Sequence, residues 1–180
     1  LLVVGVVIAL AALAYSAGPY PLSYHGLGEA AVFVFFGLVP VNLTYFIQSG
    51  TFDAIVVFAS ISIGLMGVNV LLVNNYRDVD DDREAGKRTS VVVAGRTLAA
   101  LAYLLNGLLA LSVLGVLWLR LWMEWGWWTM LPPAIYMALH LTTWHRLRLR
   151  TGAALNPILG AGAQPLALIH LPRCRRPYPC

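Results

Sequence analysis

Two long apolar runs separated by only four residues constrain this chain more than any other feature. Residues Ala30–Ser49 and Ala54–Val73 are 20 residues each and carry no charged side chain. About 20 apolar residues are needed for a helix to cross the hydrocarbon core of a bilayer. The intervening sequence, GTFD, is too short for anything but a turn. The sequence therefore predicts a transmembrane helical hairpin.

Four further apolar segments extend this interpretation to the whole chain. They are Leu1–Ala14, which fits the second half of a cut helix, Thr97–Leu119, Trp127–His145 and Ala153–Leu171. Charged residues make up 11% of the chain, less than half of the roughly 25% found in soluble domains. We therefore predict an all-α, multi-span transmembrane helical bundle with about six hydrophobic helices, the first of them truncated. A net charge of +4 does not indicate nucleic-acid binding, because the basic residues lie at the ends of apolar runs.

Glycine and polar residues within the predicted spans indicate how the helices pack. Pro40 and Asn42 are expected to kink the first helix of the hairpin and to place a polar group at membrane depth, either packed between helices or lining a cavity. Gly64 is expected to permit close helix contact in the second helix, as is Gly67. Asn106 and Gly107 favour helix packing in the span that follows.

Between the second and third full spans lies an acidic segment, Asn74–Thr89, with the sequence NNYRDVDDDREAGKRT. If the helix continues past Val73, its 3.6-residue repeat places Asn74, Asp78 and Asp82 on one face, with Asp81 close beside them. Neighbouring carboxylates at this spacing repel by roughly 2–3 kcal/mol at an effective dielectric constant of about 20. A bound cation would reverse this repulsion. Carboxylate and amide oxygens without nearby cysteine suit Mg²⁺, which often completes its shell with phosphate oxygens.

Basic residues in the same segment indicate a phosphate ligand. Gly86 permits a turn that can fold Lys87 and Arg88 back toward the acids, and Arg77 directly precedes Asp78. The alternative is a solvated loop of mixed charge between two spans. The spacing of the acids, the asparagine pair and the Gly-Lys-Arg turn favour a site for Mg²⁺ and a diphosphate.

The string N-N-x-x-D-x-x-x-D-x-x-x-G-K-R-T resembles the second aspartate-rich motif of the UbiA superfamily of intramembrane aromatic prenyltransferases. The similarity is closest to the 1,4-dihydroxy-2-naphthoate prenyltransferases (MenA-type) of menaquinone synthesis and extends to about Ala163. It implies a membrane prenyltransferase domain over residues 1–171, followed by an atypical Pro/Arg-rich tail, 172–180. It further implies transfer of a polyprenyl group from its diphosphate to 1,4-dihydroxy-2-naphthoate, giving demethylmenaquinone.

The resemblance assigns roles to particular residues of this chain. It implies Mg²⁺ ligands at Asn74, Asn75, Asp78 and Asp82, with Asp81 a weaker candidate, and catalytic roles for Asp78, Asp82, Lys87 and Arg88. Substrate-binding residues are expected at Arg77, Lys87, Arg88, Tyr15 and Tyr76. Tyr15 begins a loop that lies over the active site in the family, and Pro19 stands where other branches often have lysine.

The family's first acidic motif, N-D-x-x-D-x-x-x-D, has no copy in this chain. We expect it upstream, so that this segment alone could be inactive. The remaining alternatives are a prenyltransferase with another aromatic acceptor, and a cation channel or transporter, which would more often place charges within its spans.

Basic residues predict the orientation in the membrane. Eight of them lie on the side of the acidic segment, at positions 77, 83, 87, 88, 96, 146, 148 and 150, whereas the tight turns carry only Arg120. By the positive-inside rule the site faces the cytoplasm, which predicts a multi-pass protein of the bacterial cell membrane. Arg120–Gly126, rich in neighbouring tryptophan, is expected to form an interfacial turn. His140 and His145 could form a metal-binding pair, but an i,i+5 spacing points them about 140° apart, so they are interpreted as interfacial histidines. Oligomeric state is left open.

Overall fold

The computed structural model describes residues 2–16 and 21–157, and this part of the chain contains helices and turns but no strand. The α-helices, in chain order, are α1 (Leu2–Ser16), α2 (Gly28–Val32), α3 (Val39–Ser49), α4 (Ala54–Arg77), α5 (Val79–Glu84), α6 (Ser90–Trp125) and α7 (Leu131–Leu149). Shorter elements are a π-helix, Phe33–Leu38, and three 3₁₀-helices, Leu22–Tyr24, Trp127–Met130 and Gly152–Leu155. The all-α prediction is confirmed.

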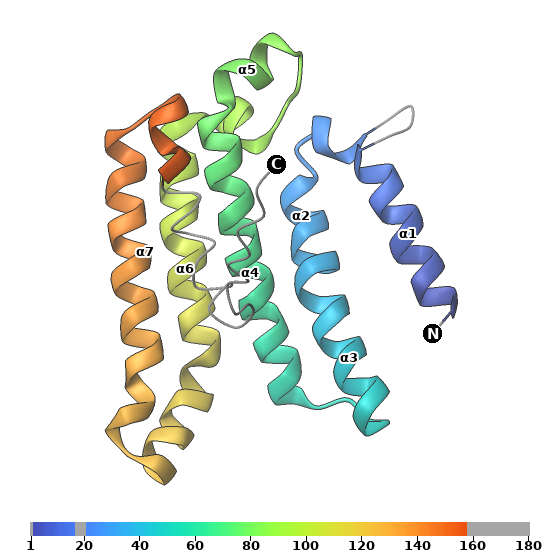
Figure 1. Cartoon of the computed structure of the whole chain (residues 1–180), viewed down its shortest axis with the longest axis vertical. Coiled ribbons are helices and arrows are strands. Elements are labelled where there is room, and N and C mark those ends of the chain that lie inside the picture. Colours follow the sequence, from blue (N-terminus) through green and yellow to red (C-terminus); the bar gives the residue numbers. More distant parts are fainter. Residues whose placement is uncertain (1, 17–20, 158–180) are drawn as a thin grey trace, which may run out of the picture.

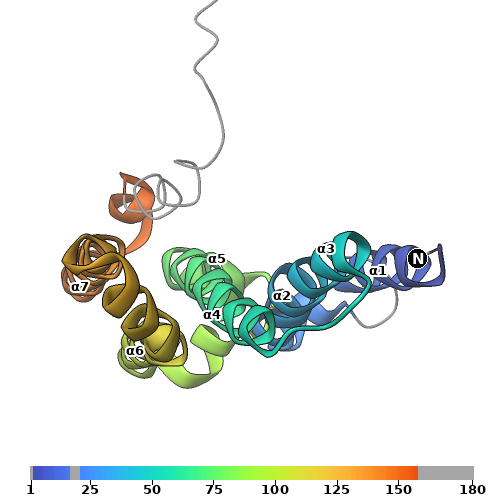
Figure 2. The ribbon, with the colours of Figure 1, turned by 90° about the horizontal axis from the view of Figure 1, so that it is seen from below.

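The long helices stand side by side in chain order and form a curved row when viewed along their axes (Figures 1 and 2). Helix α4 lies in the middle of this row, against α2, the π-helix and α3 on one side and against α6 on the other. Helix α7 packs on the far side of α6. The buried core lies mainly where α4 meets α6, and includes Val68, Leu72, Tyr76, Ala99, Ala100 and Tyr103. The chain therefore forms a helical membrane bundle centred on α4.

Within residues 2–16 and 21–157, three continuous helical segments are long and apolar enough to span a membrane, namely Gly28–Ser49, Ala54–Arg77 and Ser90–Gly115. They match the first three full spans predicted from the sequence. Helix α1 contains a shorter apolar stretch, Gly5–Tyr15. Most of the last predicted span, Ala153–Leu171, lies outside the described residues, as do Pro19 and the 172–180 tail.

The hairpin turn between α3 and α4 forms as predicted. Gly50 adopts a left-handed conformation (φ 72°), and its amide donates to the Phe46 carbonyl oxygen at 2.9 Å, which ends α3. Asp53 then caps α4, since its Oδ1 accepts from the Ile55 amide at 2.7 Å. A left-handed glycine and an aspartate cap thus reverse the chain within four residues.

The two helices of the hairpin approach most closely at Gly37 and Gly64. A Cβ atom on Gly37 would lie 2.3 Å from the Gly64 Cα atom, which confirms the predicted close contact at Gly64. Nearby, the Asn42 Nδ2 atom donates to the Ser60 Oγ atom at 2.8 Å, so Asn42 packs between helices. The π-helix ends at Leu38, two residues before Pro40. Pro40 has no backbone N–H and so cannot donate a hydrogen bond to the preceding turn.

Helix α6 differs from the prediction at both ends. It begins at Ser90, breaks at Gly95 (φ 85°, ψ 163°) and continues to Trp125. The expected start at Thr97 lies just after this break. The expected turn over Arg120–Gly126 is wrong, because the helix runs on until Gly126, the first residue there whose positive φ (83°) stops it. The length needed to span a membrane therefore did not predict the C-terminal end of α6.

His140 lies inside the bundle, so its interpretation as an interfacial histidine is wrong. Its side chain is 3% exposed, stacks on Tyr103 and Tyr136 with ring centroids 4.6 and 5.6 Å away, and places Nε2 3.2 Å from the Leu104 carbonyl oxygen. Gly107 makes room for this imidazole, since any Cβ there would meet the ring at 2.2 Å. The helix-packing interpretation of Gly107 is confirmed, and His145 is exposed.

Candidate active site

The acidic segment keeps a nearly helical path although α4 ends at Arg77. Asp78 has φ −94° and ψ 10°, and α5 begins at the next residue. Amide-to-carbonyl hydrogen bonds four residues apart persist through the junction, from Asp78 to Asn74 at 3.0 Å and from Asp82 to Asp78 at 2.8 Å. Because this repeat is maintained, Asp78 and Asp82 lie on the same side of the chain, as predicted.

These two carboxylates line a cavity of about 130 Å³, which we call the acidic cavity. Its wall comes from α1, the segment before α2, α2 itself, α4, α5 and the segment before α6. The lining residues are Tyr15, Ser23, Gly26, Gly28, Glu29, Leu71, Asn75, Asp78, Asp82, Lys87 and Thr89. Side chains more than 70 positions apart in the sequence therefore meet around the predicted site.

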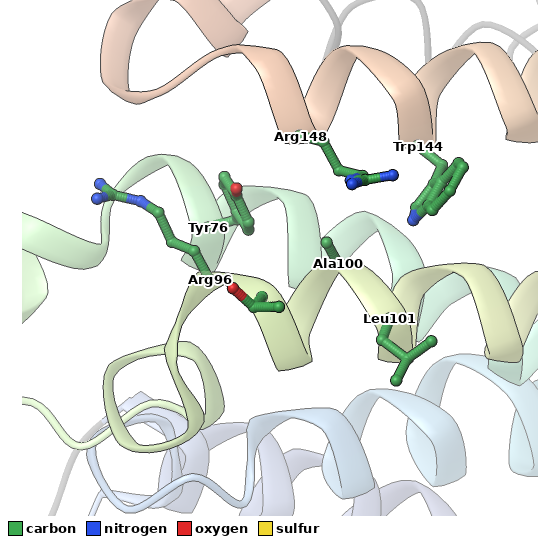
Figure 3. A pocket seen from close by; sticks show the side chains of 7 residues that line it. Tyr76, Arg96, Ala100, Leu101, Trp144 and Arg148 are labelled. Carbon is green, nitrogen blue, oxygen red and sulfur yellow. The ribbon is translucent and has the colours of Figure 1, made fainter.

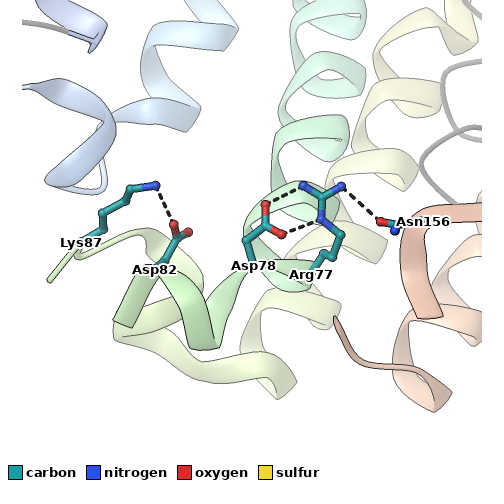
Figure 4. Close-up of polar contacts among 5 residues, drawn as sticks. All are labelled: Arg77, Asp78, Asp82, Lys87 and Asn156. Carbon is teal, nitrogen blue, oxygen red and sulfur yellow. Dashed lines mark hydrogen bonds and ion pairs between the residues drawn. The ribbon is translucent and has the colours of Figure 1, made fainter. Parts of the chain in front are cut away.

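Asp78 and Asp82 are each paired with a cation (Figure 4). Arg77 forms a fork on Asp78, with Nε–Oδ1 and Nη2–Oδ2 distances of 2.5 and 2.6 Å. The third guanidinium nitrogen of Arg77 lies 3.4 Å from the Asn156 Oδ1 atom, so α4 is tied to the segment that follows α7. The Lys87 Nζ atom contacts the Asp82 Oδ1 atom at 2.8 Å. The charge repulsion expected between these acids is thus offset by neighbouring cations.

A turn at Gly86 brings Lys87 to Asp82, which supports the predicted fold-back of this residue. Gly86 has φ 72°, and the Lys87 amide donates to the Asp82 carbonyl oxygen at 2.8 Å. The side-chain hydrogen bond to Asp82 raises the pKa of the Lys87 ammonium above its ordinary value, against the opposing effect of burial. Lys87 therefore stays protonated at neutral pH beside an almost fully buried carboxylate, Asp82, which is 6% exposed.

Glu29 is a cavity residue that the sequence assignments did not include. It is the first acidic residue of α2, and its Oε1 atom accepts from the Asn75 Nδ2 atom at 3.0 Å and from the Ser90 hydroxyl. Glu29 thereby joins α2, α4 and the start of α6 at the cavity. The available signal was a lone acid after a glycine-rich loop, GLGE, directly before an apolar span.

The remaining predicted site residues divide into three groups. Tyr15 lines the acidic cavity, as does Asn75, whereas Asn74 does not. Arg88 and Asp81 are exposed, although the Arg88 amide donates to the Tyr24 carbonyl oxygen at 2.8 Å and holds the loop before α2 in place. Tyr76 faces a different cavity, between α4, α6 and α7. Five of the predicted side chains therefore meet in one place: Tyr15, Asn75, Asp78, Asp82 and Lys87.

The chemistry of the acidic cavity fits a hard divalent cation. Its oxygen donors are the carboxylates of Glu29, Asp78 and Asp82 and the amide of Asn75, and such oxygens are preferred by Mg²⁺. Within residues 2–16 and 21–157, no three His, Cys, Asp or Glu side chains lie close enough to enclose a metal by themselves. Mg²⁺ usually takes one or two protein carboxylates and completes its shell with water and phosphate oxygens.

The chain is similar to a known protein family and to several curated proteins. The model of the UbiA prenyltransferase family matches residues 1–159. The 1,4-dihydroxy-2-naphthoate octaprenyltransferase of Haemophilus influenzae is 41% identical over 91 residues, covering 51% of this chain and 30% of that protein. The protein of the same name from Escherichia coli is 34% identical over 129 residues, 70% of this chain and 41% of that protein. No solved structure matches the chain.

A third relative, from Mycobacterium tuberculosis and of the same name, is 37% identical over 112 residues, 62% of this chain and 38% of that protein. The chain therefore spans about a third of the length of these curated relatives.

Proposed function

Because this chain belongs to the UbiA prenyltransferase family, we propose that it forms part of an enzyme that transfers a polyprenyl group from its diphosphate to an aromatic acceptor. The observation that carries the proposal is a cavity lined by Asp78, Asp82 and Lys87, with Arg77 paired to Asp78 beside it. Acids that can hold a metal lie there beside cations that can hold a diphosphate, which are the two requirements for binding this donor.

The proposed acceptor is 1,4-dihydroxy-2-naphthoate, and the product is demethylmenaquinol, the reduced form of the menaquinone precursor demethylmenaquinone. Support comes from three relatives named as 1,4-dihydroxy-2-naphthoate octaprenyltransferases at 34–41% identity. In the net reaction the bond between the prenyl carbon and the diphosphate oxygen breaks and a carbon–carbon bond to the ring forms. The carboxylate leaves the ring as CO₂, and diphosphate is released.

The chain's own residues would bind the donor and stabilise the leaving group. Asp78 and Asp82 would hold Mg²⁺, with the amides of Asn75 and Asn74 nearby, and bound Mg²⁺ would offset negative charge on the diphosphate oxygens. Lys87, already protonated, would donate to the departing diphosphate, and Arg77 and Arg88 would add positive charge at the same end. Tyr15, across the cavity on α1, would close one wall against water, which would otherwise capture the prenyl cation.

We also propose that the site faces the cytoplasm of a bacterial cell. The acidic segment, the start of α6 and the end of α7 lie at the same end of the long helices, at the top of Figure 1, so the basic residues of these elements gather on one side. Such a bias is typical of the cytoplasmic side. Labelling of a single introduced cysteine at Asp81, an exposed position, by a membrane-impermeant reagent tests this orientation. Labelling of intact cells would contradict it.

The direct test is a transfer assay with the full-length protein that contains this chain. Membranes are incubated with radiolabelled polyprenyl diphosphate, 1,4-dihydroxy-2-naphthoate and Mg²⁺, and 4-hydroxybenzoate replaces the naphthoate in a parallel arm. We expect a prenylated naphthoquinol that disappears with EDTA and returns with added Mg²⁺. Asp78→Ala and Asp82→Ala should abolish turnover, with exposed Asp81→Ala as the matched control.

The outcomes separate the parts of the proposal. Turnover with only the benzoate would overturn the acceptor, and full activity after chelation would overturn the metal assignment. The 180-residue chain assayed alone shows whether the acidic cavity suffices without the upstream acidic motif that the resemblance implies. We expect no turnover from it.

A further inference from the structure

A second and larger cavity, of about 440 Å³, lies between α4, α6 and α7 and shares no lining residue with the acidic cavity. We call it the arginine cavity. Its lining residues are Tyr76, Arg96, Thr97, Ala100, Leu101, Trp144 and Arg148. Trp144 and Arg148 extend from α7 toward the facing helices, where Tyr76 and Ala100 lie (Figure 3). Nothing in the proposed transfer reaction uses this space.

The charges around the arginine cavity are not balanced. Arg96 donates through Nη2 to the Asp80 Oδ2 atom at 2.7 Å, but Asp80 is 62% exposed and also contacts Arg83. Arg148 makes no ion pair with any described residue, and its guanidinium lies 5.0 Å from the centre of the Trp144 ring. Of the two guanidinium groups at the cavity, only that of Arg96 contacts a carboxylate, and this carboxylate is solvated, which leaves the cavity positively charged.

Buried donors without acceptors point to an anionic ligand. The Arg96 Nε–H and the Trp144 Nε1–H are buried and have no acceptor among residues 2–16 and 21–157. Both residues line the cavity. A buried donor without a partner costs about 1–3 kcal/mol, and an acceptor-only group such as phosphate would relieve it. Arginine forks bind phosphate oxygens in pairs, so the donor set suits a phosphate better than a cation or a neutral ligand.

The surroundings of the cavity favour a lipid as the source of that phosphate. Leu101 lines the cavity and is 47% exposed, and Leu98 and Leu105 lie on the same face of α6 with 56% and 53% exposure. An apolar strip therefore leads from the arginines along a membrane-spanning helix. Basic pockets between transmembrane helices near the cytoplasmic surface are typical sites for anionic headgroups.

We propose that the arginine cavity binds the phosphate headgroup of an anionic phospholipid, with an acyl chain along Leu98, Leu101 and Leu105. Arg148 and Arg96 contact the phosphate oxygens, and the Trp144 indole donates a further hydrogen bond. The lipid joins α4, α6 and α7 at their basic ends. This site is independent of the proposed transfer reaction, in which none of its lining residues has a role; Tyr76, which the resemblance assigned to substrate binding, lines this cavity instead.

The test compares bound lipid in the full-length protein by native mass spectrometry after equilibration with equimolar phosphatidylglycerol and phosphatidylcholine. We expect a preference for phosphatidylglycerol that falls about 5-fold in Arg148→Gln, since each basic residue near an anionic surface contributes about 1 kcal/mol. Arg146→Gln is the matched control, because Arg146 is exposed on the same helix and does not line the cavity. It should change the preference by less than about 2-fold.

Three results would overturn the proposal. They are equal retention of the two lipids, an equal loss of preference in Arg146→Gln and Arg148→Gln, and displacement of the lipid by millimolar inorganic phosphate or by 1,4-dihydroxy-2-naphthoate. The last would assign the arginines to a soluble anion. Unfolding of each variant is followed in parallel, and Trp144→Phe, which keeps an aromatic ring but removes the Nε1–H donor, replaces Arg148→Gln if that variant does not fold.

Discussion

The acidic cavity and the arginine cavity lie on opposite sides of the last turn of α4, and their charge arrangements differ. Asn75 faces the first and Tyr76 the second, because consecutive helical residues point about 100° apart. In the acidic cavity Asp78 and Asp82 each have a cation, whereas in the arginine cavity Arg96 contacts the exposed Asp80 and Arg148 has no carboxylate partner among the described residues. The two sides of this turn therefore carry sites of opposite character. Changes on one side should leave the other intact.

The largest expected effect comes from Asp82→Asn, which removes the buried cavity carboxylate. We expect prenyl transfer to fall by about 100-fold or more, the scale seen when one electrostatic group of an active site is lost. Asp80→Asn is the matched control, because Asp80 lies in the same short helix but contacts Arg96. Its transfer rate should stay within about 3-fold of the unchanged protein. Comparable losses in both variants would show that the two cavities do not act separately.

Two glycines test whether the walls of the cavities are independent. Gly37→Ala places Cβ 2.3 Å from the Gly64 Cα atom where the π-helix packs on α4, and Gly107→Ala meets the His140 ring at 2.2 Å between α6 and α7. Overpacking of this kind costs about 1–3 kcal/mol of unfolding free energy. Gly115→Ala, with nothing within 4 Å of its Cβ, is the control.

Detergent-based unfolding measures this loss, and lipid retention and prenyl transfer report on the cavities separately. Gly107→Ala should weaken lipid retention more than transfer, and Gly37→Ala should do the reverse. Identical profiles for the two variants would contradict separate walls.

The pairing of Lys87 with Asp82 predicts a pH dependence that the arginine cavity lacks. The pKa of Lys87 is raised in the folded protein, so the pair stabilises the fold at all pH values below the ordinary lysine pKa of about 10.4. This stabilisation is lost as pH rises through the folded pKa. The thermal midpoint of the unchanged protein should exceed that of Lys87→Gln by a constant amount from pH 7 to about 10, and the difference should shrink above that. A difference that grows with alkaline pH would contradict the pairing.

The smallest effect is expected for Arg83→Gln. Arg83 and Asp80 are 60% and 62% exposed, with 3.4 Å between the Arg83 Nη1 and Asp80 Oδ1 atoms. Exposed pairs contribute little, so unfolding free energy should change by less than about 0.5 kcal/mol. Asp80 should still neutralise Arg96 in this variant, and lipid preference should be unchanged. A several-fold change in that preference would show that Arg83 belongs to the arginine cavity.

The sequence predicted the parts of this molecule that depend on local patterns. Apolar length predicted the spans Gly28–Ser49, Ala54–Arg77 and Ser90–Gly115, the short GTFD sequence predicted the hairpin turn, and the spacing of Asp78 and Asp82 predicted their common side. To predict the spans and the common side of the acids, it is enough to know the helical repeat and the thickness of the bilayer's hydrocarbon core.

What the sequence missed depends on which helices become neighbours. Glu29 reaches Asn75 across 46 positions, and the room for His140 exists because Gly107 lies on the facing helix. Tyr76 was grouped with the acids that follow it, but its direction on α4 places it on the other side. No single-segment pattern contains that information, because it is set by tertiary packing.

The break at Gly95 shows that chirality, not bulk, restricts that position. No atom lies within 4 Å of where a Cβ would stand, yet φ is 85° and ψ is 163°, a conformation essentially limited to glycine. Every L-amino acid there, from alanine to tryptophan, would incur a similar backbone strain of about 1–3 kcal/mol. A D-alanine introduced by chemical synthesis would fit with little strain, so the mirror-image residue would be the tolerated one.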